Sequence, residues 1–495
     1  AGETSGENCH KTRCLNMVIA PLEKAPQRAP CFQEYSMIDS GKKEAYHEKI
    51  VFSFRCDTGK SINRFGKRGG ILEKFWLGYG SSQVEAAFDG AKSVRCLEPA
   101  AQPAIEDVRE AFYAAAHSPI GGAPLEQLVS SEDLVTIVIS DVTRFWSRQD
   151  LVCRELVAFL HEECGVLHQN MTVLVALGTH RGQSEKELRQ IASEEVYQKV
   201  KVVCHDCDGP LAYLGETSFG TPVWVNPLAV GRKVITIGAT VHHLMSGYGG
   251  GRKSILPGIS GKQTILHNHM MCLDPDKPCS SSRIGMGKLE DNPVHLDMTE
   301  AAALVNPVFG INIVMNQQGC QCRLVCGQWQ RAWEESCRLV QQISGVPISQ
   351  KADIVIASCG GYPKDINLYQ GIKTLLNMGQ AVKPGGTMIF VAQCPDDGGA
   401  PDFFDWSRSL KTNSLDADLR AGFTIAGYIF YAGCEVIRGG RVLMLTELSP
   451  ETLRDMGIEG YTDMQQLLAS VDFTGKDVIV MPHGGSTVPY VSQKG

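Results

Sequence analysis

The stretch Leu134-Val-Thr-Ile-Val-Ile-Ser140, with Asp141-Val-Thr-Arg144 directly after it, decides the fold of this chain. The apolar run has the length of a buried strand. From Leu151 to Cys164 the apolar side chains share one helical face, and Gly165 ends that helix. We therefore predict a strand, a loop and a helix in succession, which is the repeating unit of a parallel sheet covered on both faces.

The same pattern occurs twice more along the chain. Met171 to Gly178 has the pattern of a buried strand, and Ser184-x-x-Glu187 after it has the form of a capping box that begins a helix. Lys233 to Val241 is a third apolar strand, which leads into His243 and a glycine-rich loop. Three such units in sequence predict one parallel sheet.

Polar side chains that can take part in chemistry follow each of these three strands. Asp141 and Arg144 follow the first strand, His180 follows the second and His243 follows the third. Ligands of open parallel sheets bind at the carboxyl ends of the strands. The positions of these residues therefore predict that they surround one ligand site.

A second α/β unit is predicted toward the C-terminus. Gln328 to Ile343 has the pattern of an amphipathic connecting helix. The strands predicted after it are Ala352–Ser358, Thr387–Gln393 and Asp477–Pro482. A turn, Gly360 to Asp365, follows the first of them, with Asp365 as the expected N-cap of the next helix. Gln370 and Lys373 then lie three residues apart on one face of that helix.

The overall composition excludes several classes of protein. The chain has 495 residues, of which 43% are hydrophobic and 20% charged, as in soluble globular proteins of two or three domains. Its formal charge of -7 argues against a nucleic-acid partner, and it has no apolar run long enough to span a membrane. The N-terminal residues lack the apolar core of a secretory signal, so we expect a cytoplasmic protein that acts on a small molecule.

The 18 cysteines do not have the spacing of a disulfide framework. Cys204-His-Asp-Cys207, and Cys320-Gln-Cys322 with Cys326, could form zinc or redox sites. Neither cluster has a second ligand pair at finger spacing, so we expect reduced thiols.

The loop Gly247-Tyr-Gly-Gly-Gly-Arg-Lys-Ser254 resembles a Walker A loop, whose backbone amides bind phosphate. Arg252 stands where that motif requires its second glycine, and the loop continues to Pro257-Gly258 instead of a long helix. A nucleoside-triphosphate site is therefore the weaker interpretation. A different phosphate-bearing ligand remains expected, because glycines and an arginine suit any such anion.

His180 and His243 could be ordinary core histidines, but their positions at two strand ends favour catalysis. Two imidazoles on opposite sides of a substrate suit a racemisation by two bases, because each can gain or lose a proton near neutral pH. Arg144 and Lys373 could bind a substrate carboxylate, or could form surface ion pairs. His269 is a candidate ligand for nickel, copper or zinc.

Six motifs in order resemble the nickel-dependent lactate racemase family over about Trp76 to Pro489. They are Asp141–Arg144, Gly178–Arg181, His243–Gly258, Asn292–His295, Gly360–Gln370 and Met481–Gly485. The resemblance implies a nickel-pincer nucleotide, a pyridinium-3-thioamide-5-thiocarboxylic acid mononucleotide that holds nickel. It also implies that proteins of cofactor synthesis act on this chain in the cell.

The resemblance also implies a role for individual residues. Lys253 would carry the thioamide tether, His269 would bind nickel, and His180 and His243 would be the paired bases. The residues implied to seat the nucleotide are Asp141, Gly250, Gly251, Arg252 and Lys253. Those implied to bind substrate are Arg144, Tyr369, Gln370 and Lys373. The implied reaction is racemisation or epimerisation of a 2-hydroxy acid by hydride transfer, through a 2-keto acid.

We therefore predict an α/β chain with two Rossmann-like parallel-sheet domains and the active site in the cleft between them. The predicted parts are an extension at 1–73, a catalytic and cofactor-binding domain at 74–330, a connecting helix at 331–345 and a substrate-binding domain at 346–495. The chain departs from the family at Phe145 and His242, where proline is common. It also lacks a clear counterpart of the family's C-terminal tryptophan, near Tyr428–Tyr431.

Two other functions remain open from the residues alone. The near Walker A loop would suit an ATPase or kinase, although Arg252 and the lack of a Walker B strand argue against it. Lys253 and His269 would also suit a nonenzymatic carrier of nickel or of the cofactor.

Overall fold

A computed structural model describes residues 73–492 of the chain. The predicted extension, residues 1–73, lies outside the described residues apart from Glu73. From residue 73 to residue 492, no helix combines the length and apolar character needed to cross a membrane.

The first sheet has six strands in the order β13-β12-β9-β4-β5-β6. Its strands are β4 (Val135–Ser140), β5 (Met171–Ala176), β6 (Lys201–Cys204), β9 (Lys233–Ala239), β12 (Phe309–Met315) and β13 (Gln321–Gly327). All neighbours pair in parallel except β12 and β13. The parallel arrangement predicted for β4, β5 and β9 is confirmed, and β4 lies between the other two.

Helices and short hairpins connect the strands of this sheet. The helices are α1 (Val108–His117), α2 (Leu125–Leu128), α3 (Gln149–Glu162), α4 (Glu185–Ala192), α5 (Glu194–Lys199), α6 (Lys262–Met270) and α7 (Pro293–Val305), and the 3-10 turns are η1 (Val142–Ser147), η2 (His168–Asn170), η3 (Pro227–Ala229) and η4 (Gly251–Ser254). The hairpins are β7 (Ala212–Glu216) with β8 (Pro222–Val225), and β10 (His242–His243) with β11 (Gly247–Tyr248). The predicted capping box of α4 is present, because Ser184 and Glu187 cap each other's backbone.

Both faces of β4 are buried, which explains its unbroken apolar sequence. Val135, Ile137 and Ile139 pack in one cluster with residues of α1 and α3, while Val138 packs in another on the opposite face. The second cluster also contains residues of the second sheet, so the described part of the chain has a continuous core.

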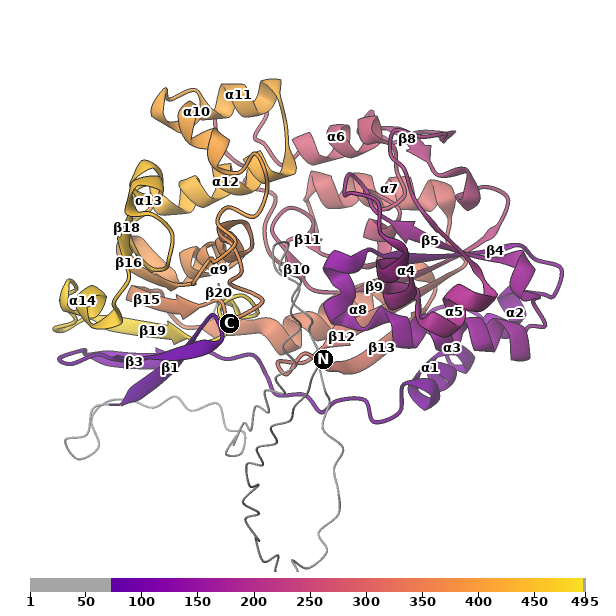
Figure 1. Cartoon of the computed structure of the whole chain (residues 1–495), viewed down its shortest axis with the longest axis horizontal. Coiled ribbons are helices and arrows are strands. Elements are labelled where there is room, and N and C mark those ends of the chain that lie inside the picture. Colours follow the sequence, from indigo (N-terminus) through magenta and orange to yellow (C-terminus); the bar gives the residue numbers. More distant parts are fainter. Residues whose placement is uncertain (1–72, 493–495) are drawn as a thin grey trace, which may run out of the picture. The chain divides into compact units, whose positions relative to one another are not determined.

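The second sheet has six parallel strands in the order β18-β17-β16-β15-β19-β3. They are β3 (Ser93–Cys96), β15 (Ala352–Ser358), β16 (Val382–Val391), β17 (Arg441–Leu445), β18 (Ile458–Tyr461) and β19 (Asp477–Met481). Figure 1 shows the indigo β3 beside the yellow β19. The strand β3 therefore belongs to the second sheet, although it lies within the range predicted for the first domain, 74–330.

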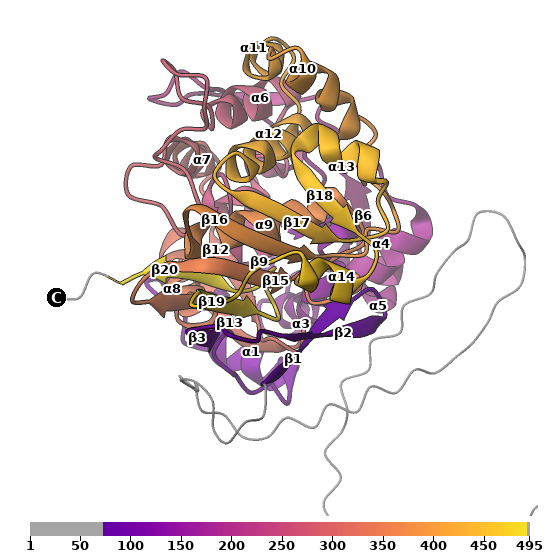
Figure 2. The same ribbon diagram turned by 90° about the vertical axis from the view of Figure 1, so that its left-hand side faces the viewer.

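Helices and a hairpin cover the two faces of the second sheet. The helices are α9 (Leu368–Ala381), α10 (Ser407–Lys411), α11 (Leu415–Ala421), α12 (Ile425–Ile437), α13 (Pro450–Met456) and α14 (Met464–Ala469), with η5 (Phe404–Trp406). One face packs against α9 and α12; the other packs against α14 and the hairpin of β1 (Lys74–Tyr79) and β2 (Ser82–Ala87) (Figure 2). Both faces of β15 are buried. Val355 packs in the core on the side of α9 and α12, whereas Ile354 and Ile356 pack on the side of α14 and the β1–β2 hairpin.

The predicted connecting helix is observed as α8 (Trp329–Ser344), two residues earlier at its start than the range 331–345. Gln328 caps its first turn, and Trp333, Cys337 and Val340 form its buried face. After α8 the chain forms β14 (Gly345–Ile348), which pairs with β20 (Val488–Val491).

The expectation that Asp365 caps the next helix is wrong. The N-cap of α9 is Asn367, whose side chain accepts the Gln370 N–H at 3.0 Å. The Asp365 carboxylate instead accepts the backbone N–H of Gly80 at 2.7 Å and of Gln393 at 3.2 Å. Asp365 therefore links the β1–β2 turn to the loop after β16.

Candidate active site

The loops that follow β4, β5 and β9 carry the predicted catalytic residues to one edge of the first sheet. Because β4 pairs with both β5 and β9, the ends of these three strands are neighbours. A backbone hydrogen bond from Gly178 N to Gly258 O, at 2.9 Å, also joins the loop after β5 to the end of the glycine-rich segment. The site therefore begins as a group of adjacent loop ends.

Asp141 and His180 form a close pair. His180 Nδ1 lies 2.6 Å from Asp141 Oδ2, and Thr143 donates its hydroxyl to the other carboxylate oxygen at 2.6 Å. Burial disfavours the charged carboxylate, but the contacts with His180, Thr143 and Arg144 outweigh burial and lower the pKa of Asp141. A charged Asp141 places the His180 proton on Nδ1, which leaves Nε2 with a free lone pair.

His243 occupies a different environment, on β10. Its Nδ1 accepts the backbone N–H groups of Met245 at 3.2 Å and Ser246 at 3.3 Å, while its Nε2 lies 2.9 Å from Lys253 Nζ. Burial first, and then the charges of Lys253 and Lys373, hold the pKa of His243 well below its ordinary value. This imidazole is therefore uncharged at neutral pH.

Positive charges converge around His243. Burial and the charges of Arg144, Arg252 and Lys373 hold the pKa of Lys253 well below its ordinary value. Burial and Arg144 lower the pKa of Lys373 to about 7. Among the described residues, neither lysine forms an ion pair with a carboxylate within 4.0 Å. A site with this surplus of positive charge is suited to anionic ligands.

The first turns of α9 carry the residues expected to bind substrate. Lys373 Nζ donates to Gln370 Oε1 at 2.6 Å, which confirms that these two side chains share one helical face. Burial raises the pKa of Tyr369, against an opposing effect of the nearby Arg144 charge. Arg144 thus affects groups on both β10 and α9, so residues far apart in sequence meet in one site.

His269, on α6, is 3% exposed, and its Nδ1 has no hydrogen-bond partner among the described residues. Burial and the charge of Lys253 lower its pKa to about 3, against a weaker opposing effect of the Ile265 carbonyl. A buried, uncharged imidazole with an unused nitrogen is a suitable metal ligand.

The glycines of the loop are required by close packing. A Cβ at Gly250 would lie 2.9 Å from Thr240 Oγ1, and one at Gly251 would lie 2.5 Å from the Trp333 ring; both residues have positive φ. The loop continues into η4, and the next α-helix starts only at Lys262. This geometry differs from a Walker A loop and argues against the ATPase or kinase interpretation.

Arg252 is directed into the protein, with 1% of its surface exposed. It donates to His295 Nδ1 at 2.9 Å, to Tyr248 O at 3.1 Å and to Ser246 O at 2.7 Å, and its guanidinium lies 3.8 Å from the Trp333 ring centre. Burial lowers the pKa of Arg252 to about 9. In this arrangement the guanidinium holds the loop that carries Lys253, and has few donors left for a phosphate.

The two departures from the family are accommodated by packing. The His242 Nε2 lies 2.9 Å from Gln341 Oε1 on α8, and its ring packs against Tyr248. Phe145 packs at the edge of the core of the first sheet, with Arg148 over its ring. In the C-terminal region, Trp406 packs against Gly427 and donates to Asp402 at 3.2 Å.

The cysteine clusters form no zinc site in the described part of the chain. Cys204, Cys207, Cys322 and Cys326 are free thiols. Within Cys204–Cys207, both His205 ring nitrogens already contact protein, at Ser260 O and at Asn226. Asp206, Cys207 and Asp208 lie close enough to share an ion, but they form an ordinary polar turn.

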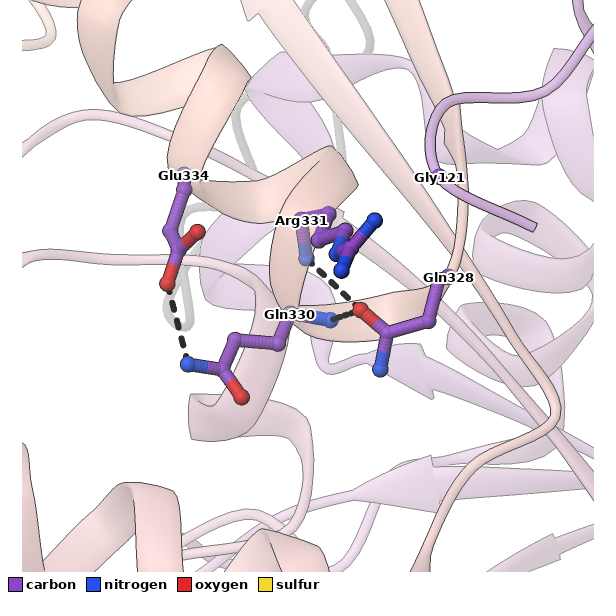
Figure 3. A pocket seen from close by; sticks show the side chains of 5 residues that line it. All are labelled: Gly121, Gln328, Gln330, Arg331 and Glu334. Atoms are coloured by element: carbon purple, nitrogen blue, oxygen red, sulfur yellow. Dashed lines mark hydrogen bonds between the residues drawn. The ribbon is translucent and has the colours of Figure 1, made fainter.

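A surface pocket lies at the start of α8, and none of the predicted site residues lines it. It is lined by Gly121, Gln328, Gln330, Arg331 and Glu334. Figure 3 shows that the Gln328 side chain already accepts the backbone N–H groups of Gln330 and Arg331. The helix start is therefore capped, and it offers no anion site.

Comparison with known families matches both halves of the chain. Residues 79–280 match the lactate racemase N-terminal domain, and residues 348–488 match the lactate racemase C-terminal domain. The chain belongs to the lactate racemase family. It is therefore an isomerase of the racemase type.

Two characterised lactate racemases are similar in sequence. The enzyme of Thermoanaerobacterium thermosaccharolyticum is 32% identical over 302 residues, which cover 60% of this chain and 68% of that enzyme. The enzyme of Lactiplantibacillus plantarum is 30% identical over 293 residues, which cover 58% of this chain and 66% of that enzyme. The matched segments span about two thirds of each relative.

Solved structures show the same fold. The lactate racemase apoprotein of Thermoanaerobacterium thermosaccharolyticum superposes with a TM-score of 0.75 at 26% identity and covers 84% of this chain and 100% of its own. A Thermotoga maritima protein matches with a TM-score of 0.57 at 17% identity, over 78% of this chain and 98% of its own, and shows the fold alone. The mixed α/β architecture with parallel sheets is thereby confirmed.

In this racemase the sequence alone missed the contacts that orient the site. The Asn292–His295 motif pointed to a functional element, but not to the contact between His295 and Arg252. Asp141 was predicted to help seat the nucleotide, and its contact with His180 was not predicted. The sequence indicated only that Asp141 and His180 follow neighbouring strands.

Proposed function

We propose that this racemase interconverts the two configurations of a 2-hydroxy acid at C2, with a nickel-pincer nucleotide tethered to Lys253. The observation that carries the proposal is the convergence of Arg144, Lys253 and Lys373 on His243, at the same strand ends that hold the Asp141–His180 pair. Such a site combines two cations for a carboxylate, Arg144 and Lys373, with an amine that can carry a tether and two imidazoles for proton transfer.

The residues present fit the proposed cofactor. His269 offers a buried imidazole nitrogen that has no other partner, and imidazole is a suitable ligand for nickel. Lys253 offers an amine in a setting that favours its uncharged, nucleophilic form. When bound, the nickel-pincer nucleotide supplies reversible hydride transfer at C2 of the substrate.

The protein groups then bind and orient the substrate. Arg144 and Lys373 hold the substrate carboxylate, with Tyr369 and Gln370 beside it on α9. His180 accepts the hydroxyl proton at Nε2, and the charged Asp141 stabilises the imidazolium that forms. The flat 2-keto acid can be reduced on either face, and His243 serves as the acid or base for the opposite face.

An isotope experiment tests this mechanism. Holoprotein is incubated with one enantiomer of lactate deuterated at C2, and the products are separated by chiral chromatography and analysed by mass spectrometry. We expect the opposite enantiomer to retain the deuterium, because hydride returns to the carbon from which it came. Loss of the label to water would reject hydride transfer in favour of carbanion chemistry.

The substrate and the competing carrier function are tested together. Holoprotein is assayed against a panel of 2-hydroxy acids with different side chains, and nickel is quantified in the same sample. We expect stoichiometric nickel and turnover of at least one compound, with loss of turnover in His180→Ala and in His243→Ala. Bound nickel without turnover of any compound would favour a nonenzymatic carrier.

A further inference from the structure

His243 and Lys253, to which the proposed function gives separate tasks, contact each other directly. Their Nε2 and Nζ atoms lie 2.9 Å apart. One of the two nitrogens must donate a proton to the other, and the choice decides the charge of Lys253 and the availability of His243. The direction of this hydrogen bond can be derived from the other contacts of the imidazole.

The second ring nitrogen of His243 settles the direction. Nδ1 faces the backbone N–H groups of both Met245 and Ser246. A backbone N–H can only donate, so Nδ1 carries a lone pair and no proton. The proton of the neutral ring therefore lies on Nε2, which donates to Lys253. An ammonium group has three donors and no acceptor, so Lys253 accepts this bond only as an uncharged amine.

The surroundings of Lys253 favour the same state. Groups on four elements face it or act on it: Arg144 on η1, His243 on β10, His269 on α6 and Lys373 on α9. Its neighbour in sequence, Arg252, adds a further positive charge. Among the described residues, none of the ion pairs within 4.0 Å involves Lys253. Burial among cations leaves an uncharged amine as the stable form.

We propose that His243 has a task that precedes turnover: with its Nε2–H it holds Lys253 as an uncharged nucleophile for cofactor attachment, and attachment then releases His243 for proton transfer. This inference rests on the proposed function, because it names how the tether of that site is made. In this order of events, the His243 imidazole first donates a hydrogen bond to Lys253 and later exchanges a proton with the substrate.

The attachment step is a condensation. The Nζ lone pair forms a C–N bond to the carbon of a thiocarboxylic acid, and the C–O bond of that group breaks. One amine proton and the proton of the thiocarboxylic acid leave with the oxygen as water, and the nitrogen keeps its second proton. The sulfur stays on carbon as the thioamide. The step needs no oxidant or reductant, only an amine that is already deprotonated.

Attachment removes the acceptor that His243 uses. The nitrogen of a thioamide shares its lone pair with the C=S group and is a poor hydrogen-bond acceptor. The Nε2–H of His243 then has no acceptor on Lys253 and is free to turn to other partners in the site. Proton transfer by His243 would therefore begin only after the tether is complete.

Nitrogen-15 NMR of the full-length apoprotein labelled at histidine tests the hydrogen-bond direction. His243→Gln assigns the signal by its loss. We expect a protonated Nε2 and an unprotonated Nδ1 in His243, both in the natural protein and in Lys253→Met, because the backbone groups set the tautomer. A protonated Nδ1 in the natural protein would make Lys253 an ammonium donor and would overturn the proposal.

Acylation of the apoprotein tests the state of the amine. With N-acetoxysuccinimide, Nζ attacks the acetyl carbon, N-hydroxysuccinimide leaves, and peptide mass mapping gives the rate at each lysine. An ordinary lysine is only about 0.04% uncharged at pH 7, so we expect Lys253 to react about 100-fold faster than the exposed Lys186. Equal rates would overturn the proposal.

Two substitutions of His243 separate its tasks. His243→Gln retains an N–H donor near the Nε2 position, and we expect it to keep most of the Lys253 reactivity while losing racemisation in holoprotein. His243→Leu has no donor, and we expect Lys253 to react at least several-fold more slowly. Unchanged reactivity in His243→Leu would overturn the role of His243. Both reactivity tests use apoprotein, so their failure is distinct from a failure of hydride transfer.

Discussion

The two histidines of the site are held in opposite ways. In the loop after β5, His180 directs Nδ1 to the carboxylate of Asp141 at 2.6 Å. In the segment after β9, the Nδ1 of His243 faces two backbone N–H groups, and within residues 73–492 the ring forms no ion pair with a carboxylate. One imidazole therefore has a lone pair on Nε2, and the other has a proton there.

This difference teaches that two similar residues at neighbouring strand ends need not be equivalent. A racemase that accepts both enantiomers must exchange the roles of its two bases, but its apoprotein begins from an asymmetric state. Asp141 can stabilise a charged His180, whereas the cations around His243 oppose a positive charge. We expect the anionic substrate and cofactor to reduce this asymmetry when they bind.

Asp141→Asn removes the carboxylate that distinguishes His180 from His243, and we expect the largest loss of activity from this substitution. An amide at this position can donate to Nδ1 and so favour the wrong tautomer, and it cannot stabilise an imidazolium. We expect kcat to fall by about 10²- to 10⁴-fold with little change in folding. Steady-state kinetics in both directions would measure it, with Asp276→Asn at an exposed aspartate as the matched control. A kcat near that of the control would remove Asp141 from the mechanism.

Arg252→Met should change the surroundings of His243 and leave those of His180 unchanged. Arg252 holds the carbonyls of Ser246 and Tyr248, next to the amides that fix His243. Its loss removes three hydrogen bonds of a buried guanidinium, to these two carbonyls and to His295 Nδ1, so we expect about 3 kcal/mol lower stability in urea denaturation.

The matched control for this substitution is Arg338→Met on α8, where an exposed ion pair is lost and stability should hardly change. The His180 signals in NMR should be unchanged in Arg252→Met, whereas those of His243 should shift. Shifts of equal size at both histidines would contradict a selective effect.

Lys373 should give the activity an alkaline limit. Burial and Arg144 lower its pKa to about 7, so the ammonium is present below this pH and is lost above it. If the charge binds the substrate carboxylate, kcat/KM should fall about tenfold per pH unit on the alkaline side of this pKa, mainly through KM. Lys373→Arg keeps its charge to much higher pH and should flatten this limb. An unchanged limb in Lys373→Arg would assign it to another group.

The sequence predicted the parts of the fold that local patterns determine. The strands at 135–140, 171–176 and 233–239 were found because both of their faces are apolar. By contrast, β3 has only four residues, all of intermediate burial, so nothing in its sequence indicated that it pairs with β19. Likewise, the strand predicted at 387–393 is observed as β16, which starts five residues earlier, at Val382.

The sequence also predicted which residues form the candidate site, but not which of them contact each other. Strand ends predicted that Asp141, His180 and His243 would meet, because parallel strands share one edge. Their hydrogen bonds depend on rotamers and loop paths, which no spacing encodes. For the same reason the contacts of Arg252 with His295 and with the Trp333 ring were not predicted.

Thr143 gives the smallest test, because it contacts both Asp141 and Arg144. Its hydroxyl donates to Asp141 Oδ1 at 2.6 Å and accepts from the Arg144 guanidinium at 3.0 Å. Thr143→Val keeps the shape but removes about 1 kcal/mol of hydrogen bonding, which predicts an about fivefold lower kcat/KM. Loss of this bond also raises the pKa of Asp141, so the acidic limit of activity should move to higher pH. Thr143→Ser keeps the hydroxyl, so we expect it to retain the natural kcat/KM and the natural acidic limit. If Thr143→Ser instead behaves like Thr143→Val, the methyl group is the important part. Thr143 would then act by packing and not by linking the Asp141 carboxylate to Arg144.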